Sequence, residues 1–329
     1  MHSVANTGWS FQTTTPLNTH IMTTPHTPLL AEKAAFTRRS FLRRSSVAGA
    51  AALLGPGALL LGTKAAQAQS PTLDLAILNF ALNLEYLEAE YYLFAFTGQG
   101  LEGNGVRVDG SGTPGGVTIK PNPRVPFTTS AFEQYAREIA IDERAHVVFL
   151  RGAISGAGGQ PVARPAIDLQ NSFNTLAQAA GLVPPGGSFD PFANEVNFLL
   201  GAFIFEDVGV TAYKGAAPLL FSRDVLESAA GILAVEAYHA GIIRTVLFSL
   251  GTAVREQAGK IAALRAQLSG AADDQGLLDR RGLANLVPAD GNSIAFSRTP
   301  RQVLNIVYGA PNAASGLFFP NGVNGPINS

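Results

Sequence analysis

Two histidines of this sequence each follow a glutamate by three residues, in segments that are otherwise mostly apolar. Glu143 precedes His146, and Glu236 precedes His239 within the stretch ILAVEAYHAGIIR. Residues three apart leave the same face of a helix, so each motif would direct a carboxylate and an imidazole into the core together. Burying such groups without partners is costly, and a metal ion is the partner that this pair of donors suits.

Chance alone does not explain the doubled motif. Residues 69–329 hold 12 glutamates and two histidines, and both histidines have a glutamate three positions earlier. By composition alone, this coincidence has a probability of roughly 0.002. The motif is still a hypothesis, and its structural context must test it. A single histidine of this kind would be interpreted as an ordinary core residue, whereas the repetition on two apolar segments favours metal ligands.

Two further apolar segments carry a glutamate followed seven residues later by a tyrosine. Glu85 precedes Tyr92 in NLEYLEAEYY, and Glu206 precedes Tyr213 in FLLGAFIFEDVGVTAYKG. Seven residues make two helical turns, so each tyrosine lies on the same stripe as its glutamate. The chain thus repeats one order twice, a Glu-x6-Tyr segment and then a Glu-x-x-His segment, which indicates an internal pseudo-repeat.

Both of these glutamates have an alternative interpretation. Glu88 lies one turn after Glu85 and could be the ligand from the first segment instead, although the tyrosine spacing favours Glu85. Glu206 could form a buried ion pair with Lys214 or Arg223 in place of binding a metal.

Four long helices are predicted to hold these residues. Ser130 begins a capping box, Pro191 fits a first helical turn and Ser222 fits an N-cap. Long apolar segments predict the four helices at residues 72–97, 130–152, 191–214 and 222–250. Gly- and Pro-rich loops are expected at 98–127, with a short hairpin, and at 153–190, and shorter helices near 168–180, at 252–269 and near 300–308.

Such helices predict an all-α four-helix bundle with long inter-helix loops and an additional C-terminal helix. Glu85 lies ~18 Å before Thr97 and Glu143 lies ~20 Å after Ser130, so an antiparallel pair brings both glutamates to one height. Four carboxylates and two imidazoles in one core require cations between them. Mixed carboxylate and imidazole donors suit iron or manganese, and two such ions can share bridging carboxylates.

The first 68 residues are predicted to be a leader. Residues 37–43, TRRSFLR, contain the twin arginine of a Tat export signal, and Ala66-Gln67-Ala68 fits a signal-peptidase site after an interrupted apolar run. The expected organisation is a leader with a Tat signal peptide at 1–68 and a bundle domain with a C-terminal extension at 69–329. The expected location is periplasmic or extracellular, at the cell envelope.

The cysteine content and the net charge of the sequence exclude several kinds of functional site and partner. The sequence has no cysteine, which excludes disulfides, thiolate nucleophiles, iron–sulfur clusters and rubredoxin-type centres. Residues 69–329 carry 17 Lys and Arg against 23 Asp and Glu, a net charge of −6, and this acidic balance argues against nucleic acid as a partner.

The motifs resemble those of the ferritin-like di-metal carboxylate superfamily. Within it, NLEYLEAEYY, FEDVGVTAYKGAAPLL and LAVEAYHAGIIR are similar to the desiccation-related ferritin-like proteins of bacteria and plants. The resemblance implies that Glu143 and Glu236 bridge two ions, and that Tyr92 and Tyr213 are catalytic-site hydrogen-bond partners or radical-quenching groups. The full set of implied ligands is Glu85, Glu143, His146, Glu206, Glu236 and His239.

The function that the resemblance implies is redox chemistry at two metal ions, iron or iron with manganese, as in a ferroxidase or peroxidase. The expected small-molecule partner is O2 or peroxide, with cell-envelope association and a homo-oligomer as further expectations. Two alternatives stay open, namely peroxide dismutation in the manner of a manganese catalase and a non-enzymatic structural or binding role in desiccation stress. The insertion at 98–127 argues against a storage cage.

Overall fold

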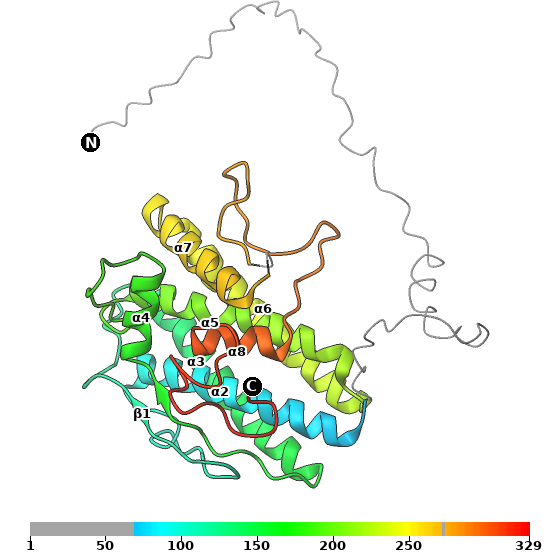
Figure 1. Cartoon of the computed structure of the whole chain (residues 1–329). Coiled ribbons are helices and arrows are strands. Elements are labelled where there is room, and N and C mark those ends of the chain that lie inside the picture. The colour runs from blue at the N-terminus through cyan, green and yellow to red at the C-terminus, as the bar shows by residue number, and fades with distance from the viewer. Residues whose placement is uncertain (1–68, 272–273) are drawn as a thin grey trace, which may run out of the picture. The chain divides into compact units, whose positions relative to one another are not determined.

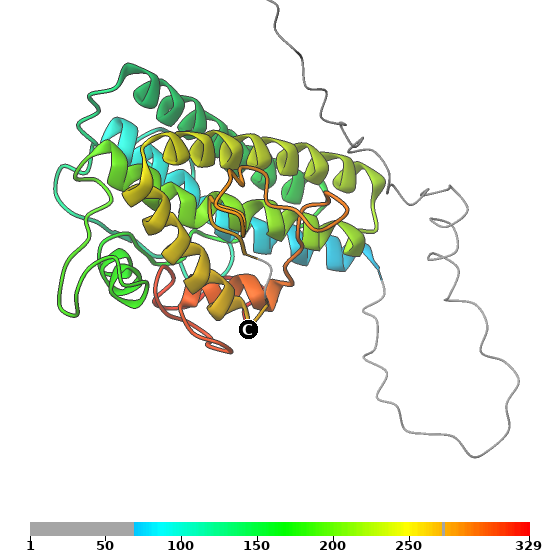
Figure 2. The same cartoon turned by 90° about the horizontal axis from the view of Figure 1, so that it is seen from above.

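The computed structural model describes residues 69–271 and 274–329. Helices make up most of this part of the chain, as Figures 1 and 2 show, and the predicted all-α class is confirmed. The leader and the Tat signal predicted at 1–68 lie outside the described residues.

Four long helices form the bundle, namely α2 (Pro71–Thr97), α3 (Ser130–Gly156), α5 (Glu195–Ala216) and α6 (Arg223–Ser249). Ser70 caps α2 by accepting a hydrogen bond from the backbone N–H of Leu73. Gly98 ends α2 with a φ of 80°, a left-handed conformation that glycine adopts at little cost. Ser222 caps α6 as predicted, by accepting from the backbone N–H of Val225.

Helix α3 begins at Ser130 as predicted, but two details predicted for the helix starts are wrong. Ser130 does not begin a capping box, because Thr129 is the N-cap residue of α3 and its backbone N–H donates to the Glu195 carboxylate at 2.9 Å. Helix α5 begins at Glu195 after an Asn194 cap, so Pro191 lies before the helix and not in its first turn. One residue, Glu195, thus begins α5 with its backbone and stabilises the start of α3 with its side chain.

The bundle consists of two helix pairs, α2 with α3 and α5 with α6 (Figures 1 and 2). Tyr92 of α2 contacts Glu206 of α5, and Tyr213 of α5 contacts Glu85 of α2, so these two helices run antiparallel. Helices α5 and α6 are long and apolar enough to cross a membrane by length and composition alone. Of the apolar window in α5, 78% is buried inside the protein, as in a core helix, and of that in α6, 44% is buried.

The two long connections pair with each other. Strand β1 (Val117–Thr118) lies parallel to β2 (Ile167–Asp168), with Val117 opposite Ile167. The hairpin predicted within 98–127 is therefore wrong. A parallel pair requires a long crossover connection, and here α3 lies within the crossover. The pairing ties the insertion before α3 to the loop after it.

The shorter helices follow the predictions closely. They are α4 (Asn171–Ala179), α7 (Thr252–Ser269) and α8 (Pro300–Tyr308), and a 3-10 turn, η1 (Ala217–Leu219), joins α5 to α6. Phe318 in the C-terminal tail is fully buried, and its ring centroid lies 4.9 Å from that of Phe205 and 5.3 Å from that of Phe173. The tail therefore completes the core beside α5.

Candidate metal centre

The six predicted ligands converge in the core from all four long helices. All six side chains are buried. Their donor atoms form two overlapping groups, within each of which the atoms lie no more than 4.8 Å apart. The first group is Glu85, Glu143, His146 and Glu236, and the second is Glu143, Glu206 and His239.

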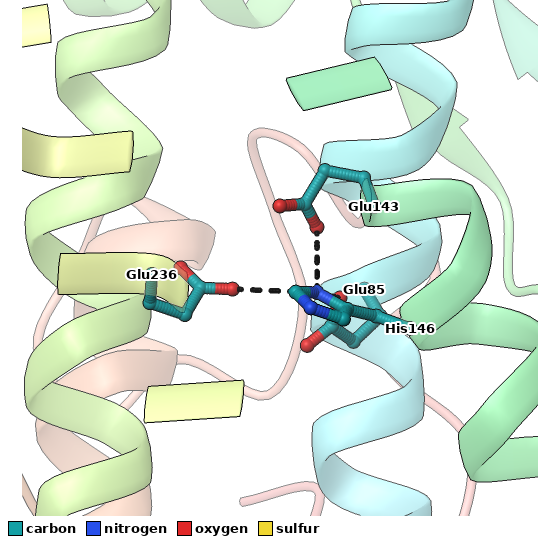
Figure 3. A group of neighbouring side chains, drawn as sticks. All are labelled: Glu85, Glu143, His146 and Glu236. Carbon is teal, nitrogen blue, oxygen red and sulfur yellow. Dashed lines mark hydrogen bonds and ion pairs between the residues drawn. The ribbon is translucent and has the colours of Figure 1, made fainter. Parts of the chain in front are cut away.

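The first group surrounds one nitrogen of His146 (Figure 3). Nδ1 of His146 lies 3.2 Å from Oε2 of Glu85 and 3.5 Å from Oε2 of Glu143. The same nitrogen lies 3.9 Å from Oε1 of Glu236. Carboxylates from three different helices therefore point at one imidazole, which is the arrangement that a shared cation would produce.

The second group surrounds His239. Nδ1 of His239 lies 3.0 Å from Oε1 of Glu143 and 3.5 Å from Oε2 of Glu206. The two histidine ring centroids are 6.4 Å apart. Glu143 thus presents one oxygen to each histidine, and its carboxylate lies where a ligand shared by two ions would lie.

Small residues on the inner faces of the helices make room for the cluster side chains. A Cβ atom at Gly209 of α5 would lie 2.1 Å from Oε2 of Glu236, so only glycine admits this glutamate in its present position. Ala140 of α3 and Ala202 of α5 are fully buried on the same inner stripes. At these inner positions the sequence has Gly or Ala, whereas large apolar residues surround them along the helices.

The two tyrosines of the Glu-x6-Tyr motifs contact the glutamates of the opposite motif. Tyr92 donates a hydrogen bond to Oε1 of Glu206, and Tyr213 donates to Oε1 of Glu85. Both phenols are buried, and burial raises the pKa of each well above its ordinary value. They therefore stay protonated and act as donors to the two glutamates.

Burial shifts most of the cluster's carboxyl groups toward the protonated form. At Glu143, however, the two nearby histidines outweigh burial and lower the pKa. Burial is the main cause that raises the pKa of Glu85 to about 7, despite the opposing effect of His146. Burial, together with the charges of Glu88 and Glu143, raises the pKa of Glu236 well above its ordinary range. A core without cations therefore holds protons that positive ions would displace.

The two imidazoles are also shifted toward the protonated form, which for a histidine is the charged form. Burial disfavours the charged ring of His146, but the carboxylates of Glu85 and Glu143 outweigh it and raise its pKa to about 12. Burial is likewise outweighed at His239, where Glu206 and Glu143 raise the pKa to about 12. The carboxylates thus stabilise positive charge at both histidine positions.

Among the described residues, several donor atoms of the cluster have no hydrogen-bond partner. They are both carboxylate oxygens of Glu143 and of Glu236, Oε2 of Glu206 and Nδ1 of His239. An unsatisfied buried polar atom costs about 1–3 kcal/mol, so a convergent set is unusual in a native core. Cations would occupy these lone pairs, and the donor set of oxygens and imidazole nitrogens fits two ions such as iron or manganese.

Glu88 lies beside the cluster and belongs to neither group. It is buried, and burial together with Glu143 and Glu85 raises its pKa well above the ordinary value. Its side chain lines a small apolar pocket with Gly209 and Phe318. The geometry therefore favours Glu85, whose Oε2 contacts His146, as the ligand from α2.

The ion-pair alternative for Glu206 finds no support among the described residues. Lys214 donates to Oγ of Ser297 at 2.7 Å and not to this glutamate. The neighbouring acid, Asp207, instead accepts from Arg244 at 2.7 Å and from Arg265 at 2.8 Å. Adjacent acids on α5 thus serve two separate buried sites.

His239 makes one further contact, which the spacing of the motifs does not predict. Oδ2 of Asp142 lies 3.1 Å from Nε2 of His239, on the side of the ring away from the cluster. The sequence signal is only that Asp142 immediately precedes Glu143, which places it at the edge of the same inner stripe. Its partner could not be identified without the packing of α3 against α6.

Fold and site together define a class of protein, a four-helix bundle whose buried carboxylate and histidine groups could hold two metal ions. Residues 73–249, which include all six cluster residues, match the ferritin-like domain family. The chain belongs to this family.

Two curated relatives support the assignment. The chain is 33% identical over 276 residues to the desiccation-related protein PCC13-62 of Craterostigma plantagineum, covering 78% of this chain and 84% of that protein. It is 30% identical over 275 residues to the ferritin-like catalase Nec2 of Nesocodon mauritianus, covering 77% of this chain and 84% of that protein. The resemblance to desiccation-related ferritin-like proteins is thereby confirmed.

Proposed function

We propose that this protein is an exported oxidoreductase that consumes hydrogen peroxide at a di-metal centre. The observation that carries the proposal is the convergence of carboxylate and imidazole donors in the bundle core, several of them without a hydrogen-bond partner in the part of the chain that the structure describes. The relative named ferritin-like catalase supports peroxide, rather than O2, as the substrate.

The proposed centre divides the six residues between two ions. Glu85 and His146 would hold one ion, and Glu206 and His239 the other, with Glu143 and Glu236 shared between them. Iron suits these donors best, and manganese is the alternative. The bound ions would supply two-electron chemistry, in which one H2O2 takes up two electrons and two protons to give two waters and another H2O2 gives up both to become O2.

The chain's own residues hold the donors and exclude water. Tyr92 and Tyr213 orient the two terminal carboxylates through their phenolic O–H groups. Ile139 and Val147 on α3 and Ile243 on α6 are buried beside the two Glu-x-x-His motifs. Such a dry, pre-organised site strengthens electrostatic interactions with a small polar substrate.

The first test is metal content together with peroxide turnover. Protein purified from its native host should contain about two ions of iron or manganese per chain. A catalase-type reaction releases O2 from peroxide without another reductant, whereas a peroxidase-type reaction consumes a reductant and releases no O2. Fewer than one ion per chain, in protein with all six residues intact, rejects the proposal.

The second test removes the shared carboxylates. Glu143→Ala with Glu236→Ala should abolish both metal retention and peroxide turnover. The matched control is Glu138→Ala with Glu227→Ala, which removes two exposed glutamates from the same two helices. Full peroxide turnover in the first double variant would contradict the proposal.

A non-enzymatic role in desiccation stress is the second candidate, and the name of the relative PCC13-62 favours it. In that case the cluster serves only the stability of the bundle. Cells that carry the Glu143→Ala, Glu236→Ala protein would then survive drying and oxidants as well as cells with the unchanged protein. Loss of survival in parallel with loss of peroxide turnover would support the enzyme instead.

Export is proposed from the stretch TRRSFLR at 37–43. Replacing Arg38 and Arg39 by lysine should retain the protein in the cytoplasm, because the twin arginine is the recognition element of the Tat route. Fractionation of the native host, with a Tat-independent secreted protein as control, measures this. Unchanged export of the double-lysine variant would contradict the proposal.

A further inference from the structure

The two Glu-x-x-His motifs differ at the residue before the glutamate. Asp142 precedes Glu143 on α3, whereas Val235 precedes Glu236 on α6. In a pseudo-repeat these two positions correspond, and Asp142 contacts the histidine of the other motif. The repeat is therefore broken at one pair of positions, by a carboxylate on one side and an apolar side chain on the other.

His239 is held from both sides of its ring. Nδ1 lies 3.0 Å from Oε1 of Glu143, and Nε2 lies 3.1 Å from Oδ2 of Asp142. A neutral imidazole with its proton on Nε2 donates to Asp142 and leaves the Nδ1 lone pair directed into the cluster. The Asp142 side chain is 39% exposed, whereas that of His239 is only 3% exposed. Asp142 thus reaches the buried ring from the surface.

His146 has a different environment. Its Nδ1 also points into the cluster, at 3.2 Å from Oε2 of Glu85. Among residues 69–271 and 274–329, however, its Nε2 has no hydrogen-bond or ion-pair partner. Val235, which holds the position equivalent to that of Asp142, offers no acceptor. Among the described residues, only His239 therefore has a carboxylate on the ring nitrogen that faces away from the cluster.

We propose that Asp142 is a positioning residue for His239 and makes the two metal positions chemically unequal. The inference rests on the di-metal centre of the proposed function, and it extends that function to the order of metal loading. A carboxylate on the second ring nitrogen fixes the orientation of a metal-binding histidine and raises its basicity. Asp142 strengthens binding at the position of Glu206 and His239 alone, so the two ions bind in separate steps.

The experiment is a calorimetric titration of the metal-free chain with Co2+ alone. The unchanged protein should show two binding steps with different constants. Asp142→Val, which copies the residue found in the other motif, should weaken one step by about 10–100-fold and leave the other unchanged. Val235→Asp, at a partly exposed position, should instead strengthen the other step.

The matched control is Glu138→Gln, which removes one negative charge from the exposed side of α3 without touching either histidine. It should leave both constants unchanged, which separates the hydrogen bond from a general charge effect. NMR of 15N-labelled histidine in the Zn2+-loaded chain gives a second readout. Asp142→Val should move the ring signals of His239 and leave those of His146 in place.

Three results would overturn the inference. Equal constants for both steps in the unchanged protein would show that the positions are equivalent. If Asp142→Val changed both binding constants equally and Val235→Asp changed neither, the role of Asp142 would be merely structural. Absence of Co2+ binding in every variant, with the helical circular dichroism intact, would reject the metal centre itself and the proposed function with it.

Discussion

The phenol of Tyr92 on α2 donates a hydrogen bond to Glu206 on α5, 114 residues further along the chain. The equivalent contact joins Tyr213 on α5 to Glu85 on α2, across 128 residues. Because α2 and α5 run antiparallel, a tyrosine two turns beyond one glutamate lies level with the other glutamate. The two halves of the pseudo-repeat therefore contact each other reciprocally, because the tyrosine of each half orients a glutamate carboxylate of the other half.

This reciprocity predicts equal effects of two substitutions. Tyr92→Phe and Tyr213→Phe should each weaken metal binding by about 10–100-fold, because each releases one carboxylate from its hydrogen bond. Metal content after dialysis against a chelator measures the loss. The control is Tyr91→Phe, which removes a buried phenol that donates to the carbonyl of Phe198 at 2.7 Å and lies outside the cluster. Equal metal loss in all three variants would indicate a general packing defect instead.

Stability of the metal-free protein should fall as the pH rises from about 4.5 to about 7. Burial raises the pKa of Glu85 from 4.5 to about 7, so in this interval the native state binds more protons than the unfolded chain. A shift of this size corresponds to about 3 kcal/mol of stability, present at low pH and lost as the pH rises through the folded pKa. The upward shift at Glu236 acts in the same direction.

Metal should reverse the sign of this pH dependence. Bound cations displace the protons from the carboxyl groups and imidazoles, so the metal-loaded protein gains stability as the pH rises. Urea unfolding at pH 5, 6 and 7, with bound metal and after chelation, measures both slopes. Parallel slopes in the two states would show that the cluster does not exchange protons for metal.

Gly209→Ala should disrupt the cluster without a change of charge. The new Cβ would lie 2.1 Å from Oε2 of Glu236, so this carboxylate must move away from the other donors. Metal affinity and peroxide turnover should fall together. Gly231→Ala on α6 is the control, because its Cβ would meet nothing within 4 Å. It should stabilise the helix by about 1 kcal/mol and leave metal binding unchanged.

The sequence was sufficient for the long helices and for the convergence of the cluster. Helix length and apolar content are local properties, and α2 matches the predicted segment to within a residue at its start. The spacing of Glu143 and His146 fixes a common helix face whatever the tertiary structure. Donors on inner stripes of a bundle must then meet, which explains why these residues could be found without a structure.

The sequence was insufficient where a distant segment decides the local structure. The start of α3 depends on the Glu195 carboxylate, and β1 pairs with β2 across the whole of α3. Asp142 illustrates the same limit within the site, since its contact with His239 depends on the approach of α3 to α6. Sequence patterns describe a face of a helix, whereas the partner of that face follows from packing.

A buried ion pair between Arg164 and Glu90 lies outside the cluster and should contribute strongly to stability. Arg164 forms an ion pair with Glu90 on α2 and donates to Oε2 of Glu102 and to the carbonyl oxygen of Gly115, at 2.9 Å and 3.0 Å. Glu90 is fully buried, so Arg164→Leu would leave its carboxylate without a counter-charge. Loss of one partner of a buried pair costs about 3–5 kcal/mol, and urea unfolding should show this loss.

The partner variant separates the cost of an unpaired charge from the loss of packing. Glu90→Gln combined with Arg164→Leu should recover much of the stability, because no buried charge remains uncompensated. Arg107→Leu, which breaks an exposed pair with Asp109, is the control and should leave the unfolding midpoint unchanged. Metal binding should persist in all of these variants, because Arg164 contacts no residue of the cluster. A double variant as unstable as Arg164→Leu would instead assign the cost to the lost contacts with the insertion at 98–127.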